Sequence, residues 1–332
     1  MRLHRVPDSC RADYDEARAV AAAFLREKRA DPAMQRRERV AGVLLAAEWC
    51  GLIAVTYALA YGLPRGPLRL LLIPWALYAG FALDVIVHYT NHWPVFRSAW
   101  ANRLWRWSGV LVFFNPLEIE HVHHEHHRAY SDPENEERPF GPAERGKSFW
   151  ASLLREAVES VLVLVPFRAM PACVAALAKK KPPEHREIVA MRWAFLAWAA
   201  VLTAIDPRDT LLSFLPAVVV VGSLASTIMN YTDHIPGDPR HPFRLATYLE
   251  PGTRAEAFFA AMNHHTAATH LTHHLFPSAH WVHLRALQRR LAPIYARQGA
   301  PRSLLVNSAL AGDPVRLLRV LAGVERRRFD LS

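Results

Sequence analysis

Four stretches of mostly apolar residues stand out along a chain that is otherwise mixed in polarity. Each is about 20 residues long, the length that a helix needs to cross the hydrocarbon core of a bilayer. They are residues 41–61, 70–87, 188–205 and 211–229. Short linkers that contain proline, residues 62–67 and 206–210, join them in two pairs. The pattern predicts an all-α integral membrane protein with four transmembrane helices in two hairpins.

The distribution of Lys and Arg predicts how these helices are oriented. The two linkers carry one arginine each, Arg65 and Arg208, whereas almost all the other basic residues lie outside the four apolar stretches. Because basic loops stay on the cytoplasmic side, both termini and the long middle section are expected there. We therefore predict a cytosolic N-terminal region (1–40), a membrane domain (41–290) whose helical cap comprises 88–187 and 230–290, and a cytosolic C-terminal tail (291–332).

Two further apolar stretches are harder to place. Residues 105–117 are too few to cross a bilayer, and charged residues and prolines interrupt residues 150–178. We interpret both as helices that lie in the membrane interface, and a third hairpin is the alternative.

Composition narrows the class of partner. The 332 residues carry a formal net charge of +10, which suits either nucleic acid or anionic lipid headgroups. The membrane-length stretches favour lipid, so we expect no nucleic-acid partner. The three cysteines form no CxxC pair, which argues against an iron–sulfur cluster or a zinc finger.

The 18 histidines are unusually numerous, and most of them are clustered. The clusters are His88 and His92; His121, His123, His124, His126 and His127; His234; and His264, His265, His270, His273 and His274. The charge pattern places all of them on the cytoplasmic side. Residues at i, i+3 and i+4 share a helical face, as His123, His126 and His127 do. Imidazole binds iron, zinc, copper and nickel, and eight or nine converging histidines are too many for one ion but fit two metals.

Three of these segments resemble the histidine boxes of the membrane fatty acid desaturase superfamily. They read HYTNH (88–92), HHEHH (123–127) and HLTHH (270–274), similar to the HxxxH, HxxHH and HxxHH of that family. The flanking residues are similar too, with Asp132-Pro133-Glu134 after the second box and Leu275-Phe276-Pro277 after the third. The resemblance covers about residues 40–290, and it implies a cytosolic cap that holds two iron ions, with O2 as co-substrate.

The resemblance also implies a ligand set. Family members use the histidines of the boxes and one more between the second and third boxes, with an asparagine four residues before it that reaches the metal through water. The matching residues are His88, His92, His123, His126, His127, His234, His270, His273, His274 and, through water, Asn230. The first box departs from the common HDxxH pattern, because Tyr89 replaces the aspartate.

Other polar residues are candidates for contacts with the ligands. Asp84 lies four residues before His88 and shares its helical face. The remaining candidates are Asp132, Asp233 and the additional histidines His121, His124, His264 and His265. Aromatic residues that could line a substrate path, or simply lie at the membrane interface, are Trp93, Trp105, Phe113, Phe114 and Trp281.

The expected activity is that of an O2-dependent di-iron oxidoreductase that introduces a double bond into a fatty acyl or related lipid chain. Its electrons would come in trans, from a ferredoxin or a similar carrier, because the chain has no electron-transfer module of its own. A hydroxylase or ketolase of the same superfamily, acting on an alkane, terpenoid or carotenoid, is the main alternative. A histidine-rich membrane metal protein without redox chemistry is a distant one.

Overall fold

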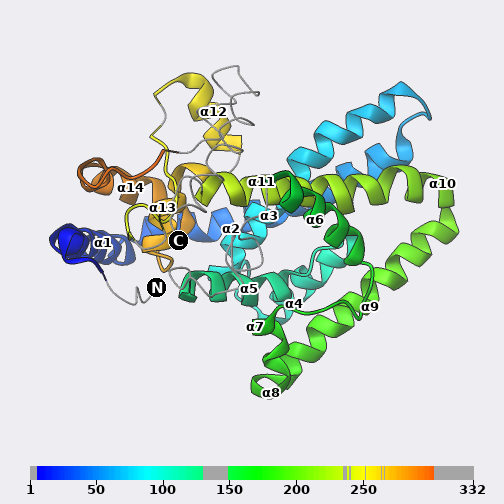
Figure 1. Cartoon of the computed structure of the whole chain (residues 1–332), viewed down its shortest axis with the longest axis horizontal. Helices are drawn as coiled ribbons and strands as arrows, with labels where there is room; N and C mark the ends of the chain where they lie inside the picture. Colours follow the sequence, from blue (N-terminus) through cyan, green and yellow to red (C-terminus); the bar gives the residue numbers. More distant parts are fainter. Residues whose placement is uncertain are drawn as a thin grey trace. The chain divides into compact units, whose positions relative to one another are not determined.

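The computed structural model describes residues 6–129, 149–234, 238, 241–250, 252–262, 264 and 266–302. Over these residues the chain is helical apart from turns, loops and an isolated β-bridge between Tyr248 and Arg302, which confirms the all-α class (Figure 1). The chain forms two compact units. Unit 1 comprises Met1–Ala41, His126–Phe149 and Ile228–Ser332, and unit 2 comprises Gly42–Glu125 and Trp150–Thr227.

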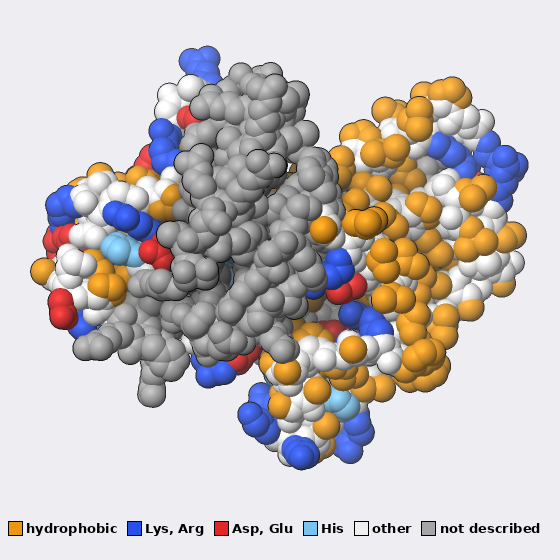
Figure 2. Space-filling model, viewed as in Figure 1, with side chains coloured by type: hydrophobic (Ala, Val, Ile, Leu, Met, Phe, Trp, Pro, Cys, Tyr) orange, Lys and Arg blue, Asp and Glu red, His pale blue; other side chains and the backbone are white. Residues whose placement is uncertain are grey.

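Four helical segments are long and apolar enough to cross a membrane, as the hydrophobic pattern predicts. They are Pro32–Gly62, Pro67–His92, Pro182–Ile205 and Pro207–Ser226. The first is α2 (Pro32–Gly62), the second contains α3 (Leu72–His92), the third is α9 (Pro182–Ile205), and the last includes α10 (Pro207–Asp209) and the start of α11 (Gly222–His234). Many of their apolar side chains are exposed, and Figure 2 shows hydrophobic side chains gathered over this part of the surface. No further helix of this kind is found within the described ranges, so they do not support a third hairpin.

The turns of the two predicted hairpins lie side by side within unit 2. Both terminal nitrogens of Arg69 donate to the carboxylate of Asp209, at 2.5 and 2.6 Å. The hydroxyls of Tyr61 and Thr210 are 2.9 Å apart. The two turns are therefore at one end of the helices, and His92 is at the opposite end of α3, about 30 Å away at 1.5 Å per residue.

Close packing of backbone brings α3 and α11 together. A Cβ atom on Gly80 would lie only 2.5 Å from the carbonyl oxygen of Gly222, so this crossing requires glycine. The segment before Gly222 is π-helical over Thr210–Phe214 and Pro216–Val221. Pro216 has no N–H to donate, which accounts for the wider turn there.

The segment over residues 105–117 is not the single helix that the sequence suggests. The structure has α4 (Ala99–Ser108), a 3₁₀ turn (Gly109–Val112) and then α5 (Pro116–Ala129). Phe113 adopts a left-handed conformation, with φ of 58°, and this residue ends the first helical stretch. Residues 150–178 are likewise divided, into the end of α6 (Phe149–Leu162), α7 (Ala172–Ala175) and the start of α8 (Leu177–Lys180), because Pro166 and Pro171 interrupt them.

Unit 1 contains α1 (Arg11–Ala30), α12 (Arg254–Met262), α13 (Thr266–Leu275) and α14 (Trp281–Arg297). Ion pairs tie α1 to α14, since Arg297 contacts Asp13 at 2.7 Å and Arg290 contacts Glu27 at 2.9 Å. α14 continues to Arg297 because Leu291 and its apolar neighbours are buried. The predicted start of a tail at residue 291 therefore falls inside a helix.

Candidate metal centre

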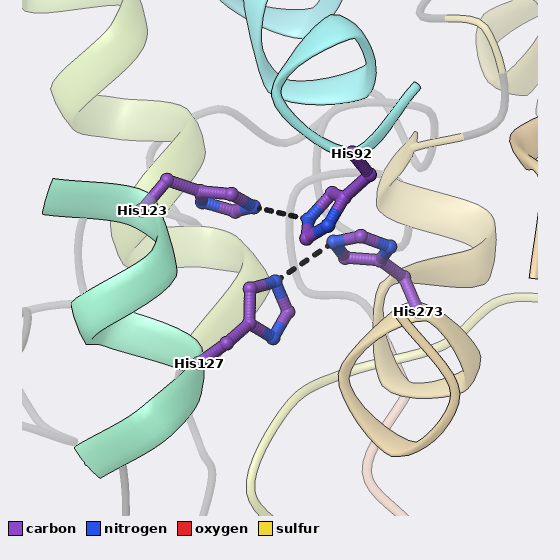
Figure 3. A group of neighbouring side chains, drawn as sticks. All are labelled: His92, His123, His127 and His273. Atoms are coloured by element: carbon purple, nitrogen blue, oxygen red, sulfur yellow. Dashed lines mark hydrogen bonds between the residues drawn. The ribbon is translucent and has the colours of Figure 1, made fainter. Parts of the chain in front are cut away.

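The last two turns of α3 carry the first pair of histidines. His88 is buried and His92 is half-buried. In unit 2, the Nε2 atoms of His92 and His123 lie 2.8 Å apart, and the ring centroids of His88 and His123 are 4.2 Å apart. The rings of His88, His92 and His123 thus gather at one place. Figure 3 shows His92 and His123 with their hydrogen-bonded ring nitrogens.

α5 presents the second box on one face. The helix begins with Pro116, and Asn115 caps it by accepting a hydrogen bond from the Glu118 N–H at 3.2 Å. The spaced histidines of the box are all buried, whereas His124 is exposed. The buried set is His123, His126 and His127. The i, i+3, i+4 spacing therefore separates the inward-facing histidines from the additional one.

A buried charge cluster in unit 2 holds the start of α5. Arg192 of α9 is fully buried and binds both carboxylate oxygens of Glu118, at 2.5 and 3.1 Å. Arg168 adds a contact of 3.4 Å to the same carboxylate. The sequence reasoning did not find this cluster, since its members are far apart along the chain.

The rest of the histidines converge in unit 1. His270, His273 and His274 of α13 are buried together with His234 at the end of α11. Their Nε2 atoms are close: 3.0 Å between His270 and His234, and 3.1 Å between His274 and His270.

Within unit 1, two histidines of α5 contact the histidines of α13. The Nε2 atom of His126 is 3.3 Å from that of His274. The Nε2 atom of His127 is 2.9 Å from that of His273, and Figure 3 shows this second pair. Ring nitrogens of His126, His234 and His274 all lie within 4.8 Å of one another, as the donors of one metal ion would.

Burial keeps two imidazoles of α13, those of His270 and His274, neutral. It lowers the pKa of His270 to about 3, and it lowers the pKa of His274 well below the usual value, with a smaller contribution from the neighbouring histidines. Neutral imidazole is the form that binds metal, so both rings are in the ligand state at pH 7.

Two of these histidines, His234 and His270, are also contacted at Nδ1, the ring nitrogen that does not face the other histidines. The backbone carbonyl of Leu245 lies 3.2 Å from Nδ1 of His234, so Nδ1 carries the proton and Nε2 presents its lone pair. A carboxylate oxygen of the fully buried Asp233 is 3.6 Å from Nδ1 of His270. The Leu245 contact comes from a main-chain atom and left no signal in the sequence, whereas Asp233 was among the predicted candidates.

The other candidates are placed elsewhere or lie outside the described residues. Asp84 accepts a hydrogen bond from Ser226, and His121 lies 2.9 Å from the carboxylate of Glu184. His264 packs edge-on against Trp281, with ring centroids 6.3 Å apart. Asp132, His265 and the side chain of Asn230 are not among the groups that the structure describes.

The donor set fits metal ions. A metal–imidazole bond is about 2.1 Å long, so two nitrogens at right angles around one ion lie about 3 Å apart. The separations of 2.8 to 3.3 Å between histidine nitrogens agree with that value. Imidazole suits several transition metals, so the donors define a metal centre without selecting the element.

The helical architecture of the described residues, with four candidate membrane spans and buried histidine clusters, fits a membrane protein that can bind metal. A comparison with protein families sharpens that class, because residues 63–305 match the family model described as fatty acid desaturase. The chain belongs to the fatty acid desaturase family. No curated protein and no solved structure matches it.

Proposed function

We propose that this protein is an O2-dependent di-iron enzyme that introduces a double bond into a fatty acyl or related lipid chain. The convergence of histidine nitrogens, most of them buried, in a chain of the desaturase family is the observation that carries the proposal. Iron is the metal of this family, and the nitrogen donors on the chain are suited to it.

The ligands that we assign are nine histidines, with Asn230 as a ligand through water: His88, His92, His123, His126, His127, His234, His270, His273 and His274. α5 is central to the assignment because it runs without a break through His123, His126 and His127. His123 contacts the end of α3, and His126 and His127 contact α13. The three spaced histidines of the second box therefore share one helical face.

When bound, iron would supply the activation of O2 that removal of hydrogen from an unactivated alkyl chain requires. The overall reaction takes two hydrogen atoms from the chain and reduces O2 to two water molecules, with two electrons from a donor and two protons from solvent. The protein itself holds the imidazoles of His270 and His274 neutral and fixes the ring of His234 through the Leu245 carbonyl. Burial of the histidines also keeps bulk water from the site.

The proposal also covers the electron donor, the side of the membrane on which the metal centre lies, and the division of the chain into domains. A ferredoxin or similar carrier would deliver electrons on the cytoplasmic face, where the basic N-terminal region, the cap and the C-terminal tail are expected. The proposed domain boundaries are those predicted from the sequence, with the last helix extended to Arg297.

The test is expression in a lipid-producing host, followed by metal analysis and lipid mass spectrometry. We expect about two irons per chain and a lipid that is lighter by two hydrogens. An added oxygen instead would assign the protein as a hydroxylase or ketolase, and zinc without reductant-dependent O2 uptake would exclude oxygen chemistry. His273→Ala should abolish the product, whereas His185→Ala on α9, a histidine outside the clusters, is the control and should retain it.

A further inference from the structure

A basic segment lies near the start of α2, the helix that contains the first candidate span. Its residues are Arg36, Arg37, Glu38 and Arg39, and they come directly before Val40. Val40 is apolar and 49% exposed. Because an exposed apolar side chain on a membrane helix faces lipid, the residues just before Val40 fall at the level of the lipid headgroups. We call the three arginines the arginine segment.

The acidic residue of this stretch points to a different side of α2 from the arginines. Glu38 and Ala41 are three positions apart and share the inward side, where Ala41 is 7% exposed. Nε2 of the buried His283 donates to the Glu38 carboxylate at 2.8 Å. The three arginines, in contrast, are all exposed. The outward side of the segment is therefore basic, and its carboxylate is engaged with α14.

The charge of the arginine segment is not compensated within the protein. None of its three side chains has an ion-pair or hydrogen-bond partner among the described residues. Asp31, the nearest acidic residue before them, caps α2 by accepting from the Ala33 N–H at 2.9 Å. The exposed Arg297 of α14, by comparison, is paired with Asp13 at 2.7 Å. An anionic partner from outside the chain would complement the unpaired arginines.

The depth of the arginine segment indicates which anion this is. Arg36 lies about 6 Å before Val40 at 1.5 Å per residue, within a headgroup layer of about 5–8 Å on each side of the bilayer. Arg36 and Arg39 share a helical face, so both can reach one headgroup, and guanidinium groups bind phosphate through paired N–H donors. We propose that the arginine segment binds the phosphate headgroup of an anionic phospholipid. This role goes beyond the proposed function, because it involves neither the metal ligands nor the reacting chain.

Lipid binding to the purified full-length protein tests this site. Iron-loaded protein in a neutral detergent is titrated with dioleoyl phosphatidylglycerol, dioleoyl phosphatidylcholine or inorganic phosphate, and native mass spectrometry counts the bound molecules. We expect phosphatidylglycerol to bind at least about tenfold more tightly than phosphatidylcholine. Arg36→Gln/Arg39→Gln should weaken binding of phosphatidylglycerol about 10- to 25-fold, since each basic residue at a lipid surface contributes about fivefold. Its affinity for phosphatidylcholine should be unchanged.

Two further variants separate charge at this site from charge elsewhere. Arg36→Lys/Arg39→Lys keeps the charge and should retain the affinity for phosphatidylglycerol within about threefold. Arg18→Gln/Arg254→Gln removes two exposed arginines from α1 and α12, which lie outside the four candidate spans. This control should bind phosphatidylglycerol like the unmodified protein. Thermal unfolding and iron content of every variant are measured alongside.

Several results would overturn the proposal. They are equal affinity for the two lipids, an equal loss in the Arg18→Gln/Arg254→Gln control, and binding of free phosphate as tight as that of phosphatidylglycerol. An Arg36→Gln/Arg39→Gln variant that binds lipid normally but takes up O2 more slowly with a ferredoxin would also overturn it, and would assign the arginines to the electron donor. Absence of iron would instead reject the proposed function, and the lipid titration would still decide this site.

Discussion

Two helices of this protein carry the same histidine spacing, and they are held in place differently. α5 and α13 each present histidines at i, i+3 and i+4, and all six are buried. α5 is anchored by charge, through Glu118 at its start and the buried Arg192. α13 is anchored by neutral hydrogen bonds, because the hydroxyl of Thr272 donates to Gln288 at 3.2 Å and lies 2.9 Å from that of Tyr295.

This difference predicts how much stability the protein loses when the contact that anchors each histidine-bearing helix is removed. Removing one partner of a buried ion pair leaves the other charge without compensation, which typically costs about 3–5 kcal/mol. Removing one neutral hydrogen bond costs about 1 kcal/mol. Loss of a histidine ligand should therefore have the same effect on either helix. Loss of the anchoring contact should destabilise the protein more at α5 than at α13.

The largest effect is expected from the ligands themselves. His126→Ala on α5 and His274→Ala on α13 each remove a buried imidazole from the converging group in unit 1. Both should release iron and lower product formation by more than the roughly 10- to 100-fold typical of residues behind the ligands. Iron analysis and product quantification check this, with His185→Ala on α9 as the control. Iron loss in only one of the two variants would show that the helices are not equivalent ligand sources.

The next effect concerns the charged anchor of α5. Arg192→Met should lower the free energy of unfolding by about 3–5 kcal/mol, because Glu118 is left in a buried site. The contact of Arg168 with the same carboxylate places the effect at the lower end of that range. Thermal unfolding in detergent and the rate of iron loss to a chelator measure the change.

Two further variants isolate the charge in this prediction. The double variant Arg192→Met/Glu118→Gln should recover much of the loss, since no buried charge then lacks a partner. Arg103→Met breaks an ion pair whose arginine is 60% exposed, and it should cost less than about 1 kcal/mol. A single Arg192→Met variant as stable as Arg103→Met would mean that α5 does not depend on charge.

Local sequence patterns were enough to predict the membrane-length helices and the histidines that share a helical face. The four candidate spans were visible because a membrane helix needs an uninterrupted apolar run. The spacing of the boxes indicated which histidines share a face, and the exposure of His124 beside the buried His123 agrees with it. Membership of the desaturase family followed from the same motifs and their flanks.

The anchors were not predictable because they depend on contacts between distant segments. Glu118 and Arg192 are separated by 74 positions, and neither lies in a motif. The carbonyl of Leu245 acts through the main chain, so its sequence identity carries no information about the contact. The broken helix at Phe113 likewise arises from a left-handed residue where the local sequence is apolar throughout.

The smallest effect is expected at the neutral anchor of α13. Tyr295→Phe removes a hydroxyl that lies 2.9 Å from the hydroxyl of Thr272, and it should lower the free energy of unfolding by about 1 kcal/mol while iron content stays the same. Tyr14→Phe is the matched control, because the Tyr14 hydroxyl makes no hydrogen bond within the described residues and should cost close to nothing. Thermal unfolding of both variants, with iron analysis, gives the comparison. A loss of iron in Tyr295→Phe as large as that in Arg192→Met would show that α13 is as sensitive as α5, because the geometry of the ligands would then depend on neutral hydrogen bonds as strongly as on buried charge.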